Sequence, residues 1–596
     1  MTNFRQFDDA KDFLTNTQHT PDIDDTLLHF RKLHHALRQE YQDSLTPMTV
    51  FVDSVMPIWK RMMDILPQKP VCDRLVAQYM DVSEAICRIL HFPTFREQYN
   101  LFWEGKLHSE YFLPQLLAVL AIVSRFTTKS QGFSHERIEG VHTPTAFALV
   151  RTWLDSLKGK QLTDIAVLQV ELLLMVCRRA LMFRPQELWI QLGSIVRMAM
   201  AMGLHRDPSE LGSRISPFMG EIRRRLWFAV FELDVQNSFD NDMPCAIREG
   251  DYTCEAPRNL HDEDLHPDMK ELPLGKPVEE HTRMQAQVLG AFSLPTRSRV
   301  SHLICRIDNL RDYQEVLELG GKLEDLLEDT NQITPRYGIS DHSRMSRVWR
   351  ERVSSDSHVR RVLLALYRPF VLNAPTCPPH IIKSFLRSCM IVLGYSEEPD
   401  PSLPHHLEVM GILHQVFKND ILPAAFSACY FIQTALPPHS NGILYEGQRS
   451  LRQVSETPSD TPPTANRFMW SPERLVQAVE RAIGYLIQSI VRNTGTKDIV
   501  SLVVTLEMVR TPEPTTENMS RILRSTLDAC LKAANSSRGK LAMVKLSSPQ
   551  PGPASFGADT FTGAQAGAYA YGDPSMSHRN AHRPQEDSWT LWSGWD

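Results

Sequence analysis

The stretch from Trp189 to Pro244 constrains the fold most strongly, because it predicts two helices joined by a polar turn. The first predicted helix ends at Gly203, a residue type that commonly terminates helices. The second begins at Ser216-Pro217, which match the preferences for a helix N-cap and a first helical position. Apolar residues recur at helical spacing along the first helix: Leu188, Leu192, Ile195, Ala199 and Met202. We therefore expect this stretch to lie at the centre of a helical fold.

The second helix carries a basic run, Arg223–Arg225, next to an apolar stripe. The stripe consists of Leu226, Trp227, Val230, Phe231 and Leu233. We expect structural ion pairs from these arginines rather than a phosphate-binding or nuclear-import patch, because a short basic run is weak evidence for either. Asp234 lies beside the stripe, and a buried carboxylate needs a partner. Arg197 or Arg206 is the candidate partner.

Helical periodicity continues through most of the chain, and strand-like alternation between turn residues is largely missing, so we predict an all-α fold. At 596 residues the chain is too long for one compact core. We expect a flexible N-terminus at 1–22, a helical domain at 23–436, a linker or long loop at 437–467, packed C-terminal helices at 468–534 and a disordered tail at 535–596.

Charge and cysteine content exclude several classes of protein. A net charge of −6 gives no overall attraction to nucleic acid. The ten cysteines are scattered without the two-residue spacing of a metal site, so we expect no metal cofactor from them. The sequence shows no secretory signal, and its apolar runs are too short to span a bilayer, so we expect an intracellular, soluble protein without membrane contact.

Catalytic signatures are also missing, since the chain contains no GxSxG, GxxxxGK[ST], GxGxxG or HExxH motif. We therefore do not expect an enzyme. The segment His261–Asp264 with His266 offers metal-ligand types, but a solvated acidic loop is the preferred interpretation. Met198, Met200 and Met202, with the aromatic residues Phe95, Tyr99, Phe102 and Trp103, favour core packing; the alternative is the lining of an effector cavity.

The last residues of the tail combine aromatic and acidic side chains. Trp589, Leu591, Trp592 and Trp595 stand among Glu586, Asp587 and Asp596. Acids keep such aromatics accessible, which is typical of a short activation or docking motif that folds on a partner. A strip that docks on its own domain is the alternative.

Several short motifs, in this order, resemble the regulatory middle region of fungal zinc-cluster transcription factors. They are Leu90-His91 with Pro93-Thr94-Phe95; the turn Gly203-Leu204-His205-Arg206-Asp207-Pro208; Arg223–Trp227 with Arg224, Arg225 and Trp227; Asp234; Met243-Pro244; and Arg368-Pro369-Phe370. The resemblance covers roughly Leu75 to Phe370. Where the family tends to have glycine before the proline, this chain has Asn241-Asp242-Met243-Pro244. Asp or Asn adopts a left-handed turn readily, so we expect the geometry to be kept.

The resemblance implies an all-helical domain in a nuclear, often dimeric regulator of metabolic, drug-resistance or secondary-metabolite genes, with a small-molecule effector as a candidate ligand. Members usually begin with a six-cysteine binuclear zinc cluster, whereas the first cysteine here is Cys72. Zinc is therefore expected only if an N-terminal module is missing from this sequence. DNA would be reached through that module or a DNA-binding partner, and the tail would recruit transcription machinery. The alternative is a zinc-free ligand-binding or scaffold module without transcriptional activity.

Overall fold

The computed structural model describes residues 7–15, 19–83, 88–125, 140–181, 185–306, 313–334, 342–373, 377–398, 406–435, 470–490, 495–511 and 514–538. Within these ranges the regular structure is helical and contains no strand, which confirms the all-α prediction. No helix in the same ranges combines the length and apolar character that crossing a membrane requires. The predicted linker at 437–467, the tail and its tryptophans lie outside the described residues.

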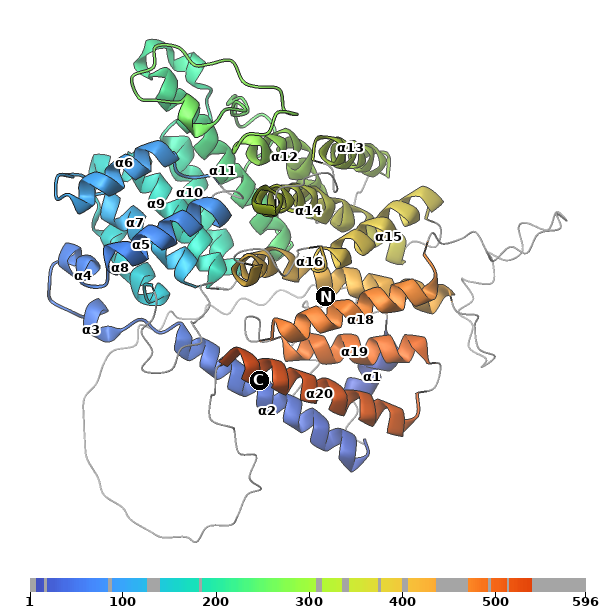
Figure 1. Ribbon diagram of the computed structural model, residues 1–596. Helices are drawn as coiled ribbons and strands as arrows, with labels where there is room; N and C mark the ends of the chain where they lie inside the picture. The colour runs from blue at the N-terminus through green and yellow to red at the C-terminus, as the bar shows by residue number, and fades with distance from the viewer. Residues whose placement is uncertain are drawn as a thin grey trace, which may run out of the picture.

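The first hydrophobic core is built by helices between residues 58 and 304 (Figure 1). Its helices are α4 (Ile58–Asp64), α5 (Lys69–Gln78), α6 (Phe92–Trp103), α7 (Phe112–Ser124), α8 (Thr143–Ser156), α9 (Ile165–Ala180), α10 (Pro185–Ala201) and α11 (Pro217–Asn241), joined by part of α12 (Gln285–Ile304). Short α3 (Thr49–Val52) precedes them. Helix α7 is buried along almost its whole length, as its continuous apolar sequence requires. The predicted core methionines and aromatics pack here: Met198, Met200, Met202, Phe95, Tyr99, Phe102 and Trp103.

The second core combines the C-terminal half of the described chain with its first two helices. Its later helices are α13 (Tyr313–Ile333), α14 (His342–Asn373), α15 (Pro379–Gly394), α16 (His406–Ala435), α18 (Pro472–Gln488), α19 (Thr496–Arg510) and α20 (Thr516–Arg538). The first two helices are α1 (Asp8–Thr15) and α2 (Pro21–Ser44), and α2 lies alongside α20 (Figure 1). His34 of α2 hydrogen-bonds Thr496 of α19 at 2.9 Å. The two ends of the helical body therefore meet in one core.

Part of the segment predicted as a flexible N-terminus is helical in the structure. Residues 8–15 form α1, which packs on α19, and its Ala10 and Leu14 are buried. The polar composition concealed a short amphipathic helix that buries only a few apolar residues.

Helix α11 is the central element, because almost every residue from Phe218 to Ser238 is buried. Phe239 near its end packs against both hydrophobic cores. The Ser216 hydroxyl caps its N-terminus by accepting a hydrogen bond from the Met219 N–H at 3.3 Å. Asp242 terminates it in the left-handed conformation at φ 54°, which confirms the geometry expected for this turn. Such a helix is surrounded by protein, so its charged residues must find partners inside the fold.

Candidate functional site

The turn before α11 is held by a carboxylate–guanidinium pair. The Asp207 carboxylate accepts two hydrogen bonds from Arg224, each at 2.8 Å, and also accepts from the backbone N–H groups of Ser209 and Glu255. Burial acts to raise the pKa of Asp207, but the bonds from Arg224 and Ser209 outweigh it and hold the pKa well below its usual value. Arg223 donates to the Met202 carbonyl at 2.8 Å, beside Gly203 at φ 73°. Two of the three consecutive arginines thus fix the turn to α11.

A second carboxylate, Asp262, lies at the centre of what we call the Asp262 cluster: Arg88, His91, Arg225 and Asp262. Arg88 and Arg225 donate to its two carboxylate oxygens at 2.5 and 2.7 Å. The Phe92 N–H also donates to the carboxylate, and the His91 ring bonds the Asp262 carbonyl at 2.9 Å. Asp262 is fully buried, so the prediction of a solvated acidic loop is wrong at this residue. Burial favours a higher pKa, yet the two arginines keep the pKa of Asp262 lowered.

Arg225 also links the cluster to Glu221, one turn earlier on α11. Glu221 is fully buried, accepts from Arg225 Nε at 3.3 Å and accepts from the Arg258 N–H at 3.1 Å. Burial dominates there and raises the pKa of Glu221. The preference for structural ion pairs over a phosphate-binding patch is confirmed, because Arg224 and Arg225 are buried and each binds a carboxylate of the same chain.

The predicted arginine partner of Asp234 is wrong. Asp234 is buried and accepts from the backbone N–H groups of Ala246 and Ile247 at 2.8 and 3.0 Å. Arg206 instead pairs with Glu210 at the surface, and Arg197 donates to the Gly193 carbonyl. Backbone amides of the segment after α11 reach Asp234 because the chain reverses at Asp242. The spacing of residues along one helix does not predict such a reversal.

The remaining motif residues form the packing around these charges. Phe95 and Trp227 are buried, and Pro93 lies in the first turn of α6. The His205 carbonyl accepts from the N–H groups of Thr253 and Cys254, while the Pro244 carbonyl accepts from the Trp189 indole at 3.2 Å. The structure thus brings these motif residues together around α11, whereas Phe370 of the last motif packs on Tyr313 in the second core. The tail residues Trp589, Leu591, Trp592 and Trp595 lie outside the described residues.

Asp234 makes the protein's stability depend on pH. Burial raises its pKa to about 6, against the two backbone hydrogen bonds, so the folded state holds this proton more tightly than the unfolded state. Stability from this group is therefore present below about pH 4 and is lost as pH rises toward 6, with a total of about 3 kcal/mol. We expect Asp234→Asn to gain stability relative to the parent protein by up to that amount between pH 4 and pH 7, measured by urea unfolding.

The exposed Asp53→Asn variant is the control for the pH series, and its stability difference from the parent should stay constant across the range. A constant difference for Asp234→Asn as well would contradict the assignment.

A third group of charges joins the two hydrophobic cores, and the sequence patterns did not predict it. We call it the Glu232 junction: Glu232 and Gln236 of α11, Arg297 of α12 and His358 of α14. Arg297 is fully buried and donates to both Glu232 carboxylate oxygens, one of them at 3.0 Å. Gln236 donates to Glu232 at 2.6 Å and contacts the His358 ring at 3.0 Å. The junction therefore ties three helices together through buried polar contacts.

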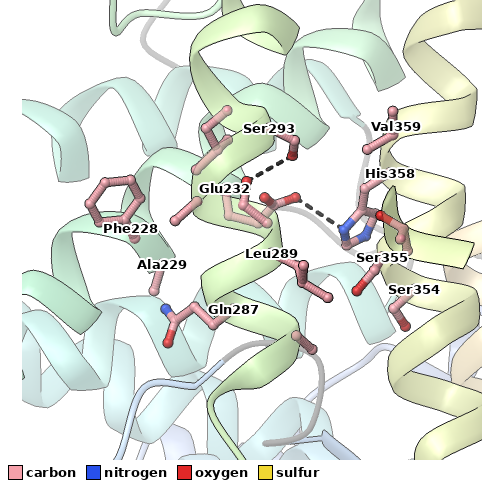
Figure 2. Close-up of a pocket in the computed structure, with 15 residues that line it drawn as sticks. Phe228, Ala229, Glu232, Gln287, Leu289, Ser293, Ser354, Ser355, His358 and Val359 are labelled. Carbon is pink, nitrogen blue, oxygen red and sulfur yellow. Dashed lines mark hydrogen bonds and ion pairs between the residues drawn. The ribbon is translucent and has the colours of Figure 1, made fainter. Parts of the chain in front are cut away.

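Figure 2 shows the Glu232 carboxylate and the His358 ring pointing toward one another, 3.2 Å apart, beside a small cavity. Burial lowers the pKa of His358 to about 3, although Glu232 acts in the opposite direction, so the ring is neutral at physiological pH. The cavity measures about 30 Å³, enough for one water molecule. Its size limits it to hydration of the junction.

The described residues do not fit a binuclear zinc cluster. The described cysteines are free thiols, most of them buried, and they are scattered over different parts of the fold. Over the same residues no three His, Cys, Asp or Glu side chains come together as a metal site would require, His261 and His266 included. The Asp262 cluster and the Glu232 junction suit a packing role, because buried ion pairs fix geometry more than they add stability.

Comparison with known proteins supports the family resemblance. Residues 76–307 match the family described as fungal specific transcription factor domain. Transcription factor opdR of Penicillium oxalicum is 34% identical over 362 residues, covering 58% of this chain and 44% of the relative. The Zn(2)-C6 fungal-type transcription factor mpsB of Macrophomina phaseolina is 31% identical, covering 36% of this chain and 30% of the relative.

A third relative, the fusarisetin A cluster transcription factor fsa6 of a Fusarium species, is 23% identical over 62% of this chain and 51% of the relative. In each case the chain spans about half of the relative's length or less. No solved structure matches the chain.

Proposed function

We propose that the chain is a nuclear transcriptional regulator of the zinc-cluster type that acts through its helical body, because residues 76–307 match the fungal specific transcription factor domain. The family is one of transcription factors and not of enzymes. DNA is reached through a partner protein or through an N-terminal zinc-cluster module outside this sequence. The domain match is the observation that carries the proposal.

The genes under control are, in this proposal, those of secondary metabolism. The support is the printed name of one relative, the fusarisetin A cluster transcription factor. The buried charges around α11 fit a regulatory rather than a DNA-contacting role for the body, since Arg224 and Arg225 face carboxylates of the same chain. The motif residues of the body then shape this domain, and the tail residues Trp589, Leu591, Trp592 and Trp595 recruit transcription machinery.

A reporter experiment tests the proposal. The full chain, fused to a heterologous DNA-binding domain and to a fluorescent tag, is expected to enter fungal nuclei and to raise transcription from the matching promoter. Replacing Trp589, Trp592 and Trp595 by alanine is expected to reduce the reporter signal to that of the DNA-binding domain alone, because the apolar contacts with the partner are lost.

The matched control replaces Phe556 and Phe561, tail aromatics that have the single acid Asp559 between them and no tryptophan nearby, and should leave the signal unchanged. A fusion that is retained in the cytoplasm and leaves transcript levels unchanged would instead support the zinc-free scaffold. If the fusion stays active after the tryptophan replacements, the chain is a regulator whose tail does not recruit the transcription machinery.

A further inference from the structure

A second cavity, of about 130 Å³, lies between the first turns of four helices: α6, α7, α9 and α11. Its apolar walls include Phe95, Phe218 and Met219, and its polar groups include Gln98 and Gln115. Among the described residues that line it there is no Asp, Glu, Lys or Arg. The absence of lining charges favours an uncharged ligand, because a buried ion without a partner is costly.

The volume fixes the size of the occupant. An apolar cavity of about 150 Å³ inside a protein takes up one benzene molecule. The cavity here is close to that size, and the lining residues Thr94, Gln98 and Met219 are partly exposed, so it is accessible from outside. One six-membered ring with a short substituent therefore fits.

The polar groups fix the chemistry of the substituent. The Gln115 amide N–H donates to the Gln169 carbonyl oxygen at 2.9 Å, and Gln169 donates to the Ile89 carbonyl at 3.0 Å. This chain of bonds fixes the Gln115 amide and leaves its carbonyl oxygen free of hydrogen bonds from the described residues. The Gln98 side chain likewise makes no hydrogen bond to them. Both are acceptors for a ligand O–H or N–H.

We propose that this cavity binds a small, uncharged ring compound that carries a hydrogen-bond donor, with phenol as the simplest example. Aromatic rings of Phe95 and Phe218 contact the ligand ring, the Gln98 carbonyl oxygen accepts from its hydroxyl, and the Gln115 carbonyl oxygen is the acceptor for a second donor on larger ligands. His91 lines the cavity as a neutral group, since burial lowers its pKa.

The cavity also has a physical connection to the Asp262 cluster. His91 packs edge-on against Phe218 with ring centroids 5.1 Å apart and bonds the Asp262 carbonyl on its other side. A ligand in the cavity would therefore contact both His91 and Phe218, the two residues whose rings join α6 and α11. The regulatory consequence, effector control of the body, rests on the proposed function, whereas the binding itself does not.

Titration of the purified full chain tests the binding. With phenol, isothermal calorimetry and ligand-detected NMR are expected to show one site with a dissociation constant on the order of 1 mM, the range for a ligand of this size. Benzoate and benzylammonium, of similar shape but charged, are expected to bind at least about tenfold more weakly. Equal binding of all three would overturn the proposal.

Two variants locate the site. Ala166→Phe places a ring at the cavity wall and is expected to weaken phenol binding at least about tenfold, while Ala148→Phe, at a similarly half-buried position of α8, should leave it unchanged. Gln98→Met keeps the volume but removes an acceptor, so it should weaken phenol binding severalfold and leave toluene binding unchanged.

Circular dichroism and the urea midpoint show whether Ala166→Phe is folded, and Gln98→Met decides the case if it is not. Unchanged phenol binding in a folded Ala166→Phe, or an equal loss for phenol and toluene in Gln98→Met, would overturn the proposal. Phenol binding without any reporter activity would keep the site and refute the proposed function instead.

Discussion

Replacing Asp262 by alanine is expected to lower the free energy of unfolding by about 3–5 kcal/mol, the cost of breaking a buried ion pair from one side. Arg88 and Arg225, both buried, would lose the carboxylate that they share, and the Phe92 N–H would lose its acceptor. Water cannot replace the carboxylate inside the packed core without opening it. Urea unfolding followed by far-ultraviolet circular dichroism measures the change.

Glu263→Ala is the matched control, since the neighbouring Glu263 is exposed, and its effect should stay within about 0.5 kcal/mol. Asp262→Asn should fall between the two, because an amide oxygen still accepts from the Phe92 N–H but no longer neutralises the arginines. If Asp262→Ala and Glu263→Ala had equal effects, the carboxylate would not be the centre of the cluster.

The sequence predicts the helices of this protein well because the helical signal is local. Spacing of apolar residues, the Ser216-Pro217 start and the Gly203 stop each act within a few residues, and the structure keeps them. Asp242 is a local signal of the same kind, since its residue type tolerates the left-handed turn that ends α11.

Asp262 shows why the site itself could not be predicted in the same way. Its neighbours Glu263 and Asp264 make the segment look like a solvated acidic loop, and its partner Arg88 is distant in the sequence. Burial of Asp262 is decided by how α6 and α11 pack, which is tertiary information. The same reason explains Asp234, whose hydrogen-bond donors lie beyond a chain reversal and not on the preceding helix.

The sequence contains one indication that Glu232 is part of a buried polar contact. The residue stands inside the apolar stripe, between Phe231 and Leu233, and a carboxylate in that position signals a buried partner. The identity of the partner, Arg297, and the approach of His358 depend on how α12 and α14 pack on α11, which no spacing within α11 records.

The Glu232 junction should show the second large effect. Glu232→Ala is expected to cost about 3–5 kcal/mol, because Arg297 is fully buried and would face a neutral His358 in place of the carboxylate. The loss should appear in urea unfolding and should also weaken the attachment of α12 and α14 to α11, which hydrogen exchange of the α12 amides would detect as faster opening.

The double variant Glu232→Leu with Arg297→Met separates the charge from the packing. Apolar side chains of similar length remove both ions together, so most of the stability lost in Glu232→Ala should return. Arg299→Met, on the same helix but partly exposed and paired at the surface, is the control and should change stability by about 0.5 kcal/mol or less. A double variant as unstable as Glu232→Ala would mean that the unpaired charge of Arg297 is not the cause of the loss. If the double variant recovers stability but loses reporter activity, the buried charges serve regulation. The apolar pair would then maintain the fold but not the function that the polar pair supports.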